Sequence, residues 1–256
     1  MSNIEIKVNN KNKKTFNAIF YLLKNLSNQI NLSINKNELH IQGMDISHVI
    51  LFDLKLSKEW FEEYKLNEDE YKFSLDSNIF YSVITTKNEE QTLIIKLVED
   101  DILNIELINN NKNNDLNKFF KIPLIDYDYH ELTIQENEYD ADVTIYSKKI
   151  ADVLDELSNF GDNVLISFFE NYINFETKGD SCEMIVNIEI NNMVSYSIIE
   201  DKTFQITYNL SYLNKLCTNK LTNEIDFSFS NDLPLKIRYD LGENSSLVFF
   251  IASKIN

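Results

Sequence analysis

The chain has 256 residues, 43% of them hydrophobic, which is enough to bury a sizeable core in one domain or two. Its formal charge of −17 argues against a protein that binds nucleic acid over its whole surface, because phosphate contacts need clustered lysine and arginine. No run approaches the roughly 18 apolar residues of a membrane span, and the N-terminal residues lack the apolar core of a secretory signal, so we expect an intracellular protein without a membrane partner.

The first half of the chain predicts antiparallel strands and two helices. Thr15–Leu26 places large apolar side chains on one broad helical face, opposite Lys14 and Lys24. Alternating apolar and polar residues mark the strands, and Gly43 is expected at a turn. In chain order the other predicted elements are strands at 4–8, 30–34, 38–41, from 49 and at 71–75, a helix at 77–86, and a hairpin of 93–98 with 102–108.

The second half repeats this order. A helix over Lys148–Phe160 precedes two strands that align with 30–41 when about 134 positions are subtracted. A strand at 204–208 with a helix at 210–218 aligns with 71–86, and strands at 225–230 and 235–239 align with the hairpin. Four segments matching in order at a nearly constant offset indicate an internal duplication.

A connector separates the halves. The run from Lys121 to Glu131 fits neither helical nor strand periodicity, so we expect an exposed link. We therefore divide the chain into a subdomain at 1–119, a connecting loop at 120–135 and a subdomain at 136–256. Each half would pack two helices on one side of a curved antiparallel sheet, an α+β layout. Sheet ends left open can pair head to tail with further copies and close into a ring.

The lysines are unevenly distributed. Lys11–Leu26 and Tyr208–Thr222 contain lysines and no acid, although the chain as a whole is acidic. Such segments can present a local positive surface on a protein that repels nucleic acid elsewhere. They are equally compatible with ordinary solvated helix faces, and composition alone leaves both interpretations open.

Three segments carry a resemblance to a known family. They read MDISHV at Met44–Val49, NDLPLKIRY at Asn231–Tyr239 and FFIASKI at Phe249–Ile255, with support from ELTIQENEY at Glu131–Tyr139 and LSNFGD at Leu157–Asp162. With them the chain resembles, from end to end, the proliferating cell nuclear antigen (PCNA) family of DNA sliding clamps. The resemblance implies the DNA-clamp fold, a homotrimeric ring whose twelve helices surround duplex DNA, and a non-enzymatic processivity factor and scaffold for replication and repair that needs no cofactor.

The resemblance also implies three sets of site residues. Lysines on or beside the four helices would face DNA in the channel: Lys13, Lys14, Lys24, Lys87, Lys148, Lys149, Lys215 and Lys220. A pocket near the connector would bind short peptides of a polymerase, clamp loader, flap nuclease or ligase through Met44, His48, Val49, Leu132, Ile134, Pro234, Phe250 and Ala252. Two edge strands would join subunits through Leu116, Lys118, Phe120 and Ile122 on one side and Cys182, Met184, Val186 and Ile188 on the other.

Some residues depart from the family pattern. Asp152 and Asp155 stand where family members carry basic residues in the third helix, which leaves open how strongly that helix contacts DNA. Glu170 stands in place of a regulatory lysine, so regulation by ubiquitin at that position is open as well.

Two other functions compete with the sliding clamp. One is a subunit of a heterotrimeric checkpoint clamp, or a clamp-like scaffold that never encircles DNA. The other is a metal-dependent enzyme built on Asp126, Asp128 and His130, although no two of the chain's three histidines have metal-ligand spacing. For a clamp we expect the nucleus, or whichever compartment hosts replication, including a cytoplasmic replication site.

Overall fold

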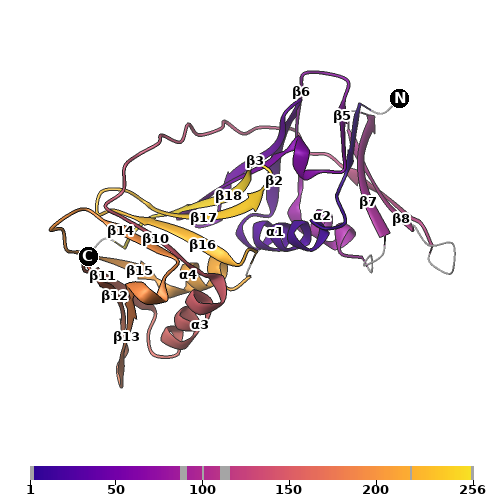
Figure 1. Cartoon of the computed structure of the whole chain (residues 1–256). Coiled ribbons are helices and arrows are strands. Elements are labelled where there is room, and N and C mark those ends of the chain that lie inside the picture. The colour runs from indigo at the N-terminus through magenta and orange to yellow at the C-terminus, as the bar shows by residue number, and fades with distance from the viewer. Residues whose placement is uncertain (1–2, 87–90, 100, 110–115, 220, 255–256) are drawn as a thin grey trace. The chain divides into compact units, whose positions relative to one another are not determined.

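The computed structural model describes residues 3–86, 91–99, 101–109, 116–219 and 221–254, which form antiparallel sheets and α-helices (Figure 1). The chain divides into two compact units. Unit 1 comprises Met1–His48, Phe52–Leu132 and Leu241–Leu247, and unit 2 comprises Val49–Leu51, Thr133–Asp240 and Val248–Asn256. Among the helices formed by the described residues, none is long and apolar enough to cross a membrane.

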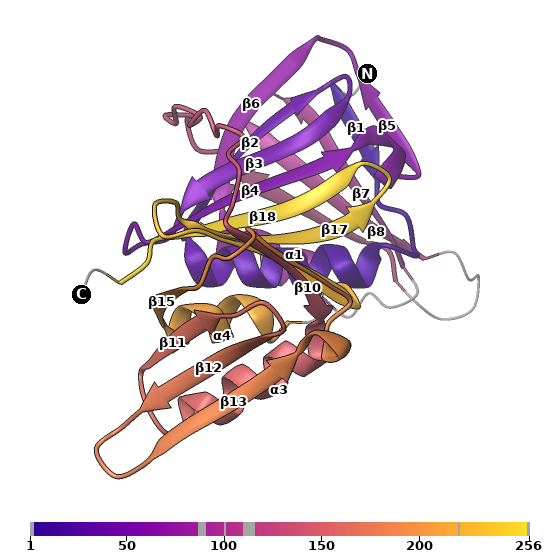
Figure 2. The same cartoon turned by 60° about the vertical axis from the view of Figure 1, so that its left-hand side comes forward.

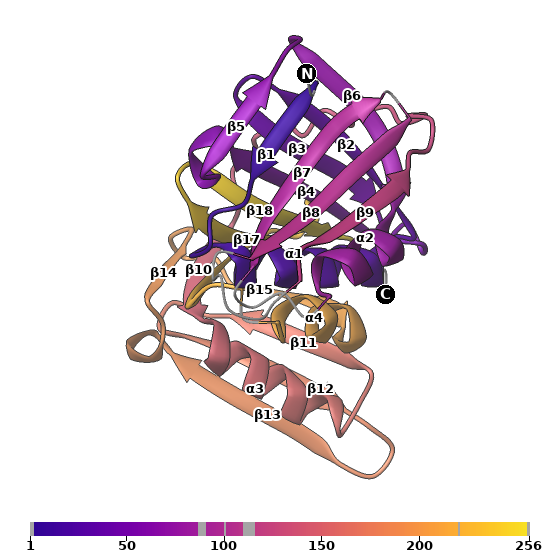
Figure 3. The same ribbon diagram turned by 90° about the vertical axis from the view of Figure 1, so that its right-hand side faces the viewer.

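Unit 1 contains two sheets and two helices. Its elements are β1 (Ile4–Lys7), α1 (Lys13–Leu26), β2 (Gln29–Asn35), β3 (Glu38–Met44), β4 (Ile50–Ser57), a 3₁₀ turn (Lys58–Trp60), β5 (Glu63–Leu66), β6 (Glu70–Asp76), α2 (Ser77–Ile84), β7 (Gln91–Glu99), β8 (Ile102–Asn109) and β9 (Lys118–Pro123). One sheet has the order β5-β1-β7-β8-β9, and the other contains β4-β3-β2-β6. Helices α1 and α2 lie next to each other (Figure 3).

The core of unit 1 explains why α1 forms where it does. Every large apolar side chain of the predicted helical face is buried, from Phe16 to Leu26. Phe20 lies 4.6 Å from Phe16 and 4.7 Å from Phe80 of α2, measured between ring centroids, and Trp60 packs on Phe16 at 6.1 Å. Aromatic contacts of this kind add to the hydrophobic stabilisation of the buried area, so they hold α1 and α2 together.

Unit 2 has the same organisation (Figure 2). Its elements are β10 (Ala141–Tyr146), α3 (Ser147–Ser158), β11 (Asn163–Phe168), β12 (Tyr172–Lys178), β13 (Glu183–Glu189), a 3₁₀ turn (Ile190–Asn192), β14 (Ser195–Ile198), β15 (Phe204–Asn209), α4 (Leu210–Cys217), β16 (Glu224–Phe229), β17 (Leu235–Gly242) and β18 (Ser245–Ile251). One sheet contains β14-β10-β16-β17-β18, the other has the order β13-β12-β11-β15, and α3 packs against α4. The tip of the β17–β18 hairpin belongs to unit 1.

The strand pairing confirms the duplication. In unit 1, β1 lies between β5 and β7, and β2 lies between β3 and β6; in unit 2, β10 and β11 have the corresponding neighbours. The helix caps repeat too. Asp76 accepts a hydrogen bond from the Ile79 N–H at the start of α2, and Asn209 accepts one from the Ser211 N–H at the start of α4. Both side chains satisfy helix N–H groups that otherwise have no partner.

The sequence prediction missed the short strands β5, β10 and β14 and placed Gly43 wrongly. Gly43 lies inside β3, not at a turn. A Cβ atom added there would lie 2.5 Å from Cζ of Phe52, a buried ring. The residue is therefore glycine because the Phe52 ring fills the space of a side chain.

Replacing Gly43 by alanine tests this packing. The added methyl group must displace the Phe52 ring, so we expect Gly43→Ala to lower the free energy of unfolding by about 1–3 kcal/mol in urea titrations. The double variant with Phe52→Leu should lose less than the sum of the two single changes. Equal stability of Gly43→Ala and the original chain would show that the ring does not occupy this space.

Candidate functional site

The predicted DNA-facing lysines of unit 1 have different environments. Lys14 is exposed near the start of α1. The ammonium of Lys24 lies 4.3 Å from the ring centroid of Tyr81 on α2 and 5.2 Å from that of Tyr21 on α1, so two aromatic faces hold its charge between the helices. Lys13 is only 6% exposed, and its ammonium donates to the backbone oxygen of Gln91. Lys13 is therefore not presented to solvent, contrary to its predicted role.

In unit 2 as well, some of the predicted lysines are exposed and another is hydrogen-bonded within the unit. Lys148 is exposed in the first turn of α3, whereas the ammonium of Lys149 donates to Asn192, 3.1 Å from its backbone oxygen and 2.9 Å from Oδ1. Lys215 is partly exposed in the last turn of α4. Asp152 and Asp155 are exposed on α3, so that helix presents acids as well as lysines. Lys87 and Lys220 lie outside the described residues.

Unit 1 contains three of the predicted pocket residues. Met44 ends β3 and is partly exposed, and His48 is exposed in the following turn with a φ of 57°. That turn is closed by a hydrogen bond of 3.0 Å from the His48 N–H to the backbone oxygen of Asp45. Leu132, at the end of the connector, is 49% exposed.

Unit 2 contains the other five. The structure brings Val49 and Ala252 together, because the Ala252 N–H donates to the backbone oxygen of Val49 at 3.2 Å. Phe250, in β18, and Ile134 are partly exposed, and Pro234 and Ala252 are exposed. The pocket itself stays a prediction.

Two sheet edges match the predicted subunit contacts. Strand β9 is the last strand of its sheet and pairs only with β8, and β13 ends its sheet beside β12. Both edges expose large apolar side chains, Phe119 at 67% and Ile185 at 56%. On the predicted interface, Leu116 and Cys182 are exposed, Phe120, Met184 and Val186 are partly exposed, and Ile122 and Ile188 are buried in their own units.

The other sheet ends are short or covered. Strands β5 and β14 span four residues each. Ile125 of the connector exchanges two backbone hydrogen bonds with Ser74 of β6, at 2.7 and 3.0 Å. Lys254 donates its N–H to Thr207 of β15. Among the described residues, β6 and β15 each have a backbone contact from another segment on their outer side, whereas β9 and β13 end their sheets without a neighbouring strand, a feature that proteins usually cover or pair.

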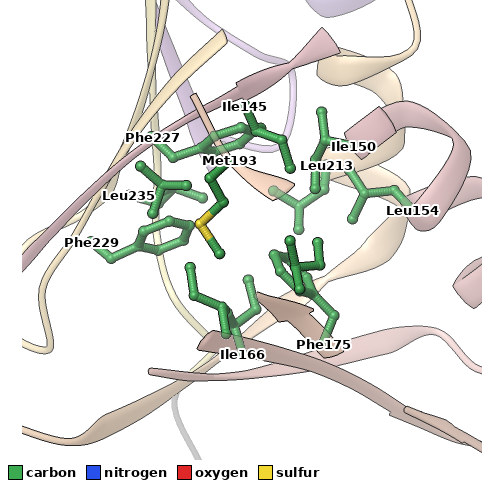
Figure 4. A pocket seen from close by; sticks show the side chains of 13 residues that line it. Ile145, Ile150, Leu154, Ile166, Phe175, Met193, Leu213, Phe227, Phe229 and Leu235 are labelled. Atoms are coloured by element: carbon green, nitrogen blue, oxygen red, sulfur yellow. The ribbon is translucent and has the colours of Figure 1, made fainter. Parts of the chain in front are cut away.

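Two features of the described residues bear on the metal-dependent enzyme considered from the sequence. A small cavity of about 20 Å³ in unit 2 is lined only by apolar side chains from α3, α4 and the strands, including Leu154, Phe175 and Met193 (Figure 4). It offers no group for proton transfer. No three His, Cys, Asp or Glu side chains among the residues described are grouped so as to hold a metal ion.

The sequence analysis missed two candidate residues in unit 1. Ile46 is strongly exposed in the turn that follows β3. Gln42 is buried, and its amide pairs with the backbone of Leu132. The apolar residue in an exposed turn was a usable signal, whereas Gln42 stands on the polar face of an alternating strand and gave none.

Family comparisons cover almost the whole chain. The family model described as proliferating cell nuclear antigen, N-terminal domain, matches residues 4–131, and the model for the C-terminal domain of the same protein matches residues 133–254. The chain belongs to the PCNA family.

Curated relatives agree with this assignment. The protein is 27% identical over 253 residues to proliferating cell nuclear antigen 2 of Plasmodium falciparum (isolate 3D7), covering 94% of this chain and 95% of that protein. It is 29% identical over 252 residues to proliferating cell nuclear antigen of Chaetomium thermophilum (strain DSM 1495 / CBS 144.50 / IMI 039719), covering 95% and 94%.

Solved structures confirm the fold of this PCNA-family protein. PCNA from Thermococcus kodakaraensis superposes with a TM-score of 0.88 at 19% identity, covering 98% of this chain and all of that one. Proliferating cellular nuclear antigen from Entamoeba histolytica gives 0.87 at 21% identity, with complete coverage of both chains. The DNA-clamp fold with two similar subdomains is thus shown, and the family is one of sliding clamps that act as scaffolds in DNA replication.

Proposed function

We propose that this chain forms a closed homotrimer that encircles duplex DNA and tethers a replicative polymerase to it. The ring would be held on DNA by its topology, so that it raises the effective concentration of the polymerase at the template without a tight DNA contact. Family membership supports this function, and the open edges β9 and β13 are the observation in the chain itself that carries it.

The two edges are complementary in charge as well as in backbone groups. Lys118 and Lys121 lie on β9, and Glu183 and Glu189 lie at the ends of β13. Pairing β9 of one copy with β13 of the next gives each edge a neighbouring strand and covers Phe119 and Ile185. Because each copy has one edge of each kind, the contact is head to tail, and it closes into a ring when the rotation between successive copies brings the last copy back to the first.

The DNA-facing surface is proposed to lie on the helices. Lys14, Lys24, Lys148 and Lys215 supply positive charge there. Lys87 and Lys220, which lie outside the described residues, are assigned to the same surface from the sequence alone. Lys13 and Lys149 donate hydrogen bonds within their own subunit and are left out. Contacts of this kind bind phosphate and read no base sequence. The chain can therefore act on DNA while its overall charge is −17.

Partner proteins are proposed to dock by a short peptide beside the connector. Met44, His48 and Leu132 of unit 1 and Val49, Ile134, Pro234, Phe250 and Ala252 of unit 2 are the residues we assign to this surface. A polymerase, clamp loader, flap nuclease or ligase would insert aliphatic and aromatic anchors, which usually carry most of the affinity in such contacts.

The proposed domain organisation of the chain is a subdomain at 1–119, a connecting loop at 120–135 and a subdomain at 136–256.

The chain is proposed to have no catalytic activity of its own and to work in the nucleus or another compartment that hosts replication.

One observation favours a second candidate function, that of a checkpoint-type clamp subunit. The exposed Asp152 and Asp155 on α3 weaken the case for DNA contact there and suit a subunit of a checkpoint-type heterotrimer.

Threading onto DNA ends tests the proposed ring. The purified protein should thread onto a long duplex that is anchored at one end and free at the other, and a bulky cap added afterwards should retain it through a high-salt wash. A cap added before the protein should prevent retention, because a closed ring then has no end to pass. Equal retention with both orders of addition would contradict encirclement.

Two double variants compare lysines assigned to the DNA-facing surface with exposed lysines outside the helices. Lys14→Glu with Lys24→Glu should shorten the lifetime of threaded protein at low salt, since two channel charges are reversed. Lys36→Glu with Lys65→Glu reverses two exposed lysines outside the helices and should change it much less. Equal effects of the two pairs would place the DNA contact elsewhere.

The docking surface gives a separate prediction. Ile134→Ala with Phe250→Ala should weaken binding of a synthetic peptide with a glutamine, an aliphatic anchor and two aromatic residues by at least about tenfold, because truncating a side chain that holds an anchor typically costs about 1 kcal/mol or more. Calorimetry measures the affinity, and native mass should be unchanged. Ile199→Ala, an exposed isoleucine outside the surface, is the control. Unchanged peptide binding in the double variant would contradict the assignment.

A further inference from the structure

Part of unit 1 is organised around two polar side chains that are nearly inaccessible to water. Gln42 of β3 is 4% exposed and Asp53 of β4 is 6% exposed. The last residues of the connector, Tyr129 to Leu132, contact this face of the sheet through hydrogen bonds to Gln42. Buried polar groups are stable only when they are hydrogen-bonded, so the partners of these two side chains determine what the cluster does.

Gln42 binds the main chain of Leu132 as a neighbouring strand would. Its Oε1 accepts from the Leu132 N–H at 2.7 Å, and its Nε2 donates to the Leu132 oxygen at 3.1 Å. Oε1 also accepts from the Tyr129 hydroxyl at 3.0 Å, and Nε2 also donates to Oδ1 of Asp53 at 3.2 Å. Two donors and two acceptor positions are all that a glutamine amide has, so every one is used.

Asp53 fixes the orientation of that amide. Burial raises the pKa of its carboxyl, but the hydrogen bond and charge of His40, with Lys55 and Gln42, outweigh this and hold the pKa below its ordinary value. An ionised carboxylate can only accept hydrogen bonds, so the NH₂ side of Gln42 must face Asp53. The oxygen of Gln42 is then turned toward the Leu132 N–H and the Tyr129 hydroxyl.

His40 links Asp53 to the connector. Its Nε2 lies 2.6 Å from Oδ1 of Asp53, and its Nδ1 lies 3.6 Å from Oε2 of Glu131. A neutral imidazole has one N–H, and donating it to Asp53 leaves the lone pair of Nδ1 facing the Glu131 carboxylate. A protonated ring carries an N–H on both nitrogens and a positive charge between the two acids.

The other charged groups around His40 belong to three elements. Lys55 of β4 lies 3.7 Å from Asp53, and Lys72 of β6 lies 3.9 Å from Glu131. Glu70 of β6 pairs with Lys72 at 3.2 Å, and the hydroxyl of Tyr127 donates to Glu131 at 3.2 Å. These contacts place His40 and Glu131 in a charged network that joins β4, β6 and the connector.

We propose that Gln42, Asp53 and His40 form a latch that fixes the main chain of Leu132 while leaving its side chain, 49% exposed, free for a partner peptide. The part that concerns the partner rests on the docking function proposed above. The part that concerns the connector does not, because it can be measured on the protein alone.

Amide hydrogen exchange of the connector is the direct test. In the full chain, the Leu132 amide should be protected relative to its intrinsic exchange rate. Gln42→Met keeps the length of the side chain and removes its four hydrogen bonds, so protection of Leu132 should fall by about tenfold or more. The Ile125 amide, which donates to Ser74 instead, should keep its protection and shows that the sheet is intact. An unprotected Leu132 amide in the original chain, or unchanged protection in Gln42→Met, would overturn the latch.

Peptide binding completes the test. Gln42→Met should weaken binding of the synthetic peptide described above by about tenfold, because a released connector must be ordered again before it can bind. A loss of Leu132 protection with unchanged peptide affinity would overturn the docking role of the latch. Failure of the docking surface itself is recognised separately, by unchanged binding when Ile134 and Phe250 are both replaced by alanine.

Discussion

Two sheet edges without a neighbouring strand, β9 and β13, are the constraint on which this account depends. A strand edge exposes alternating N–H and C=O groups that must be covered or paired, and the other sheet ends of the described chain are short or covered. These two edges also carry exposed apolar residues and opposite charges. A chain with one edge of each kind uses both only by joining copies of itself or of a close relative, and a closed arrangement leaves no edge free.

Each of the two duplicated units provides one edge, β9 in unit 1 and β13 in unit 2. The units have the same strand pairing and the same helix caps, yet their charges have diverged: α1 contains lysines and no acid, whereas α3 presents Asp152 and Asp155. An acidic protein can act on DNA if its positive charge is concentrated on the helices and the rest of its surface repels phosphate.

Long amphipathic elements could be predicted from the sequence, and close tertiary contacts could not. The apolar spacing from Phe16 to Leu26 fixes the buried face of α1, and the duplication could be read from a constant offset. Strands β5 and β14 are four residues long, too short for a clear alternation. Gly43 and Lys13 were misplaced because the Phe52 ring and the backbone oxygen of Gln91, which explain them, come from distant segments. Gln42 stands on the polar face of β3, and its burial depends on the connector that covers it.

Native mass as a function of concentration tests the central claim most directly. Analytical ultracentrifugation of the purified chain should give a species of three times the 30.1 kDa of one chain, dissociating only at high dilution. A mass of 30.1 kDa at every concentration would contradict a self-assembled ring and would favour a subunit that needs different partners to close it.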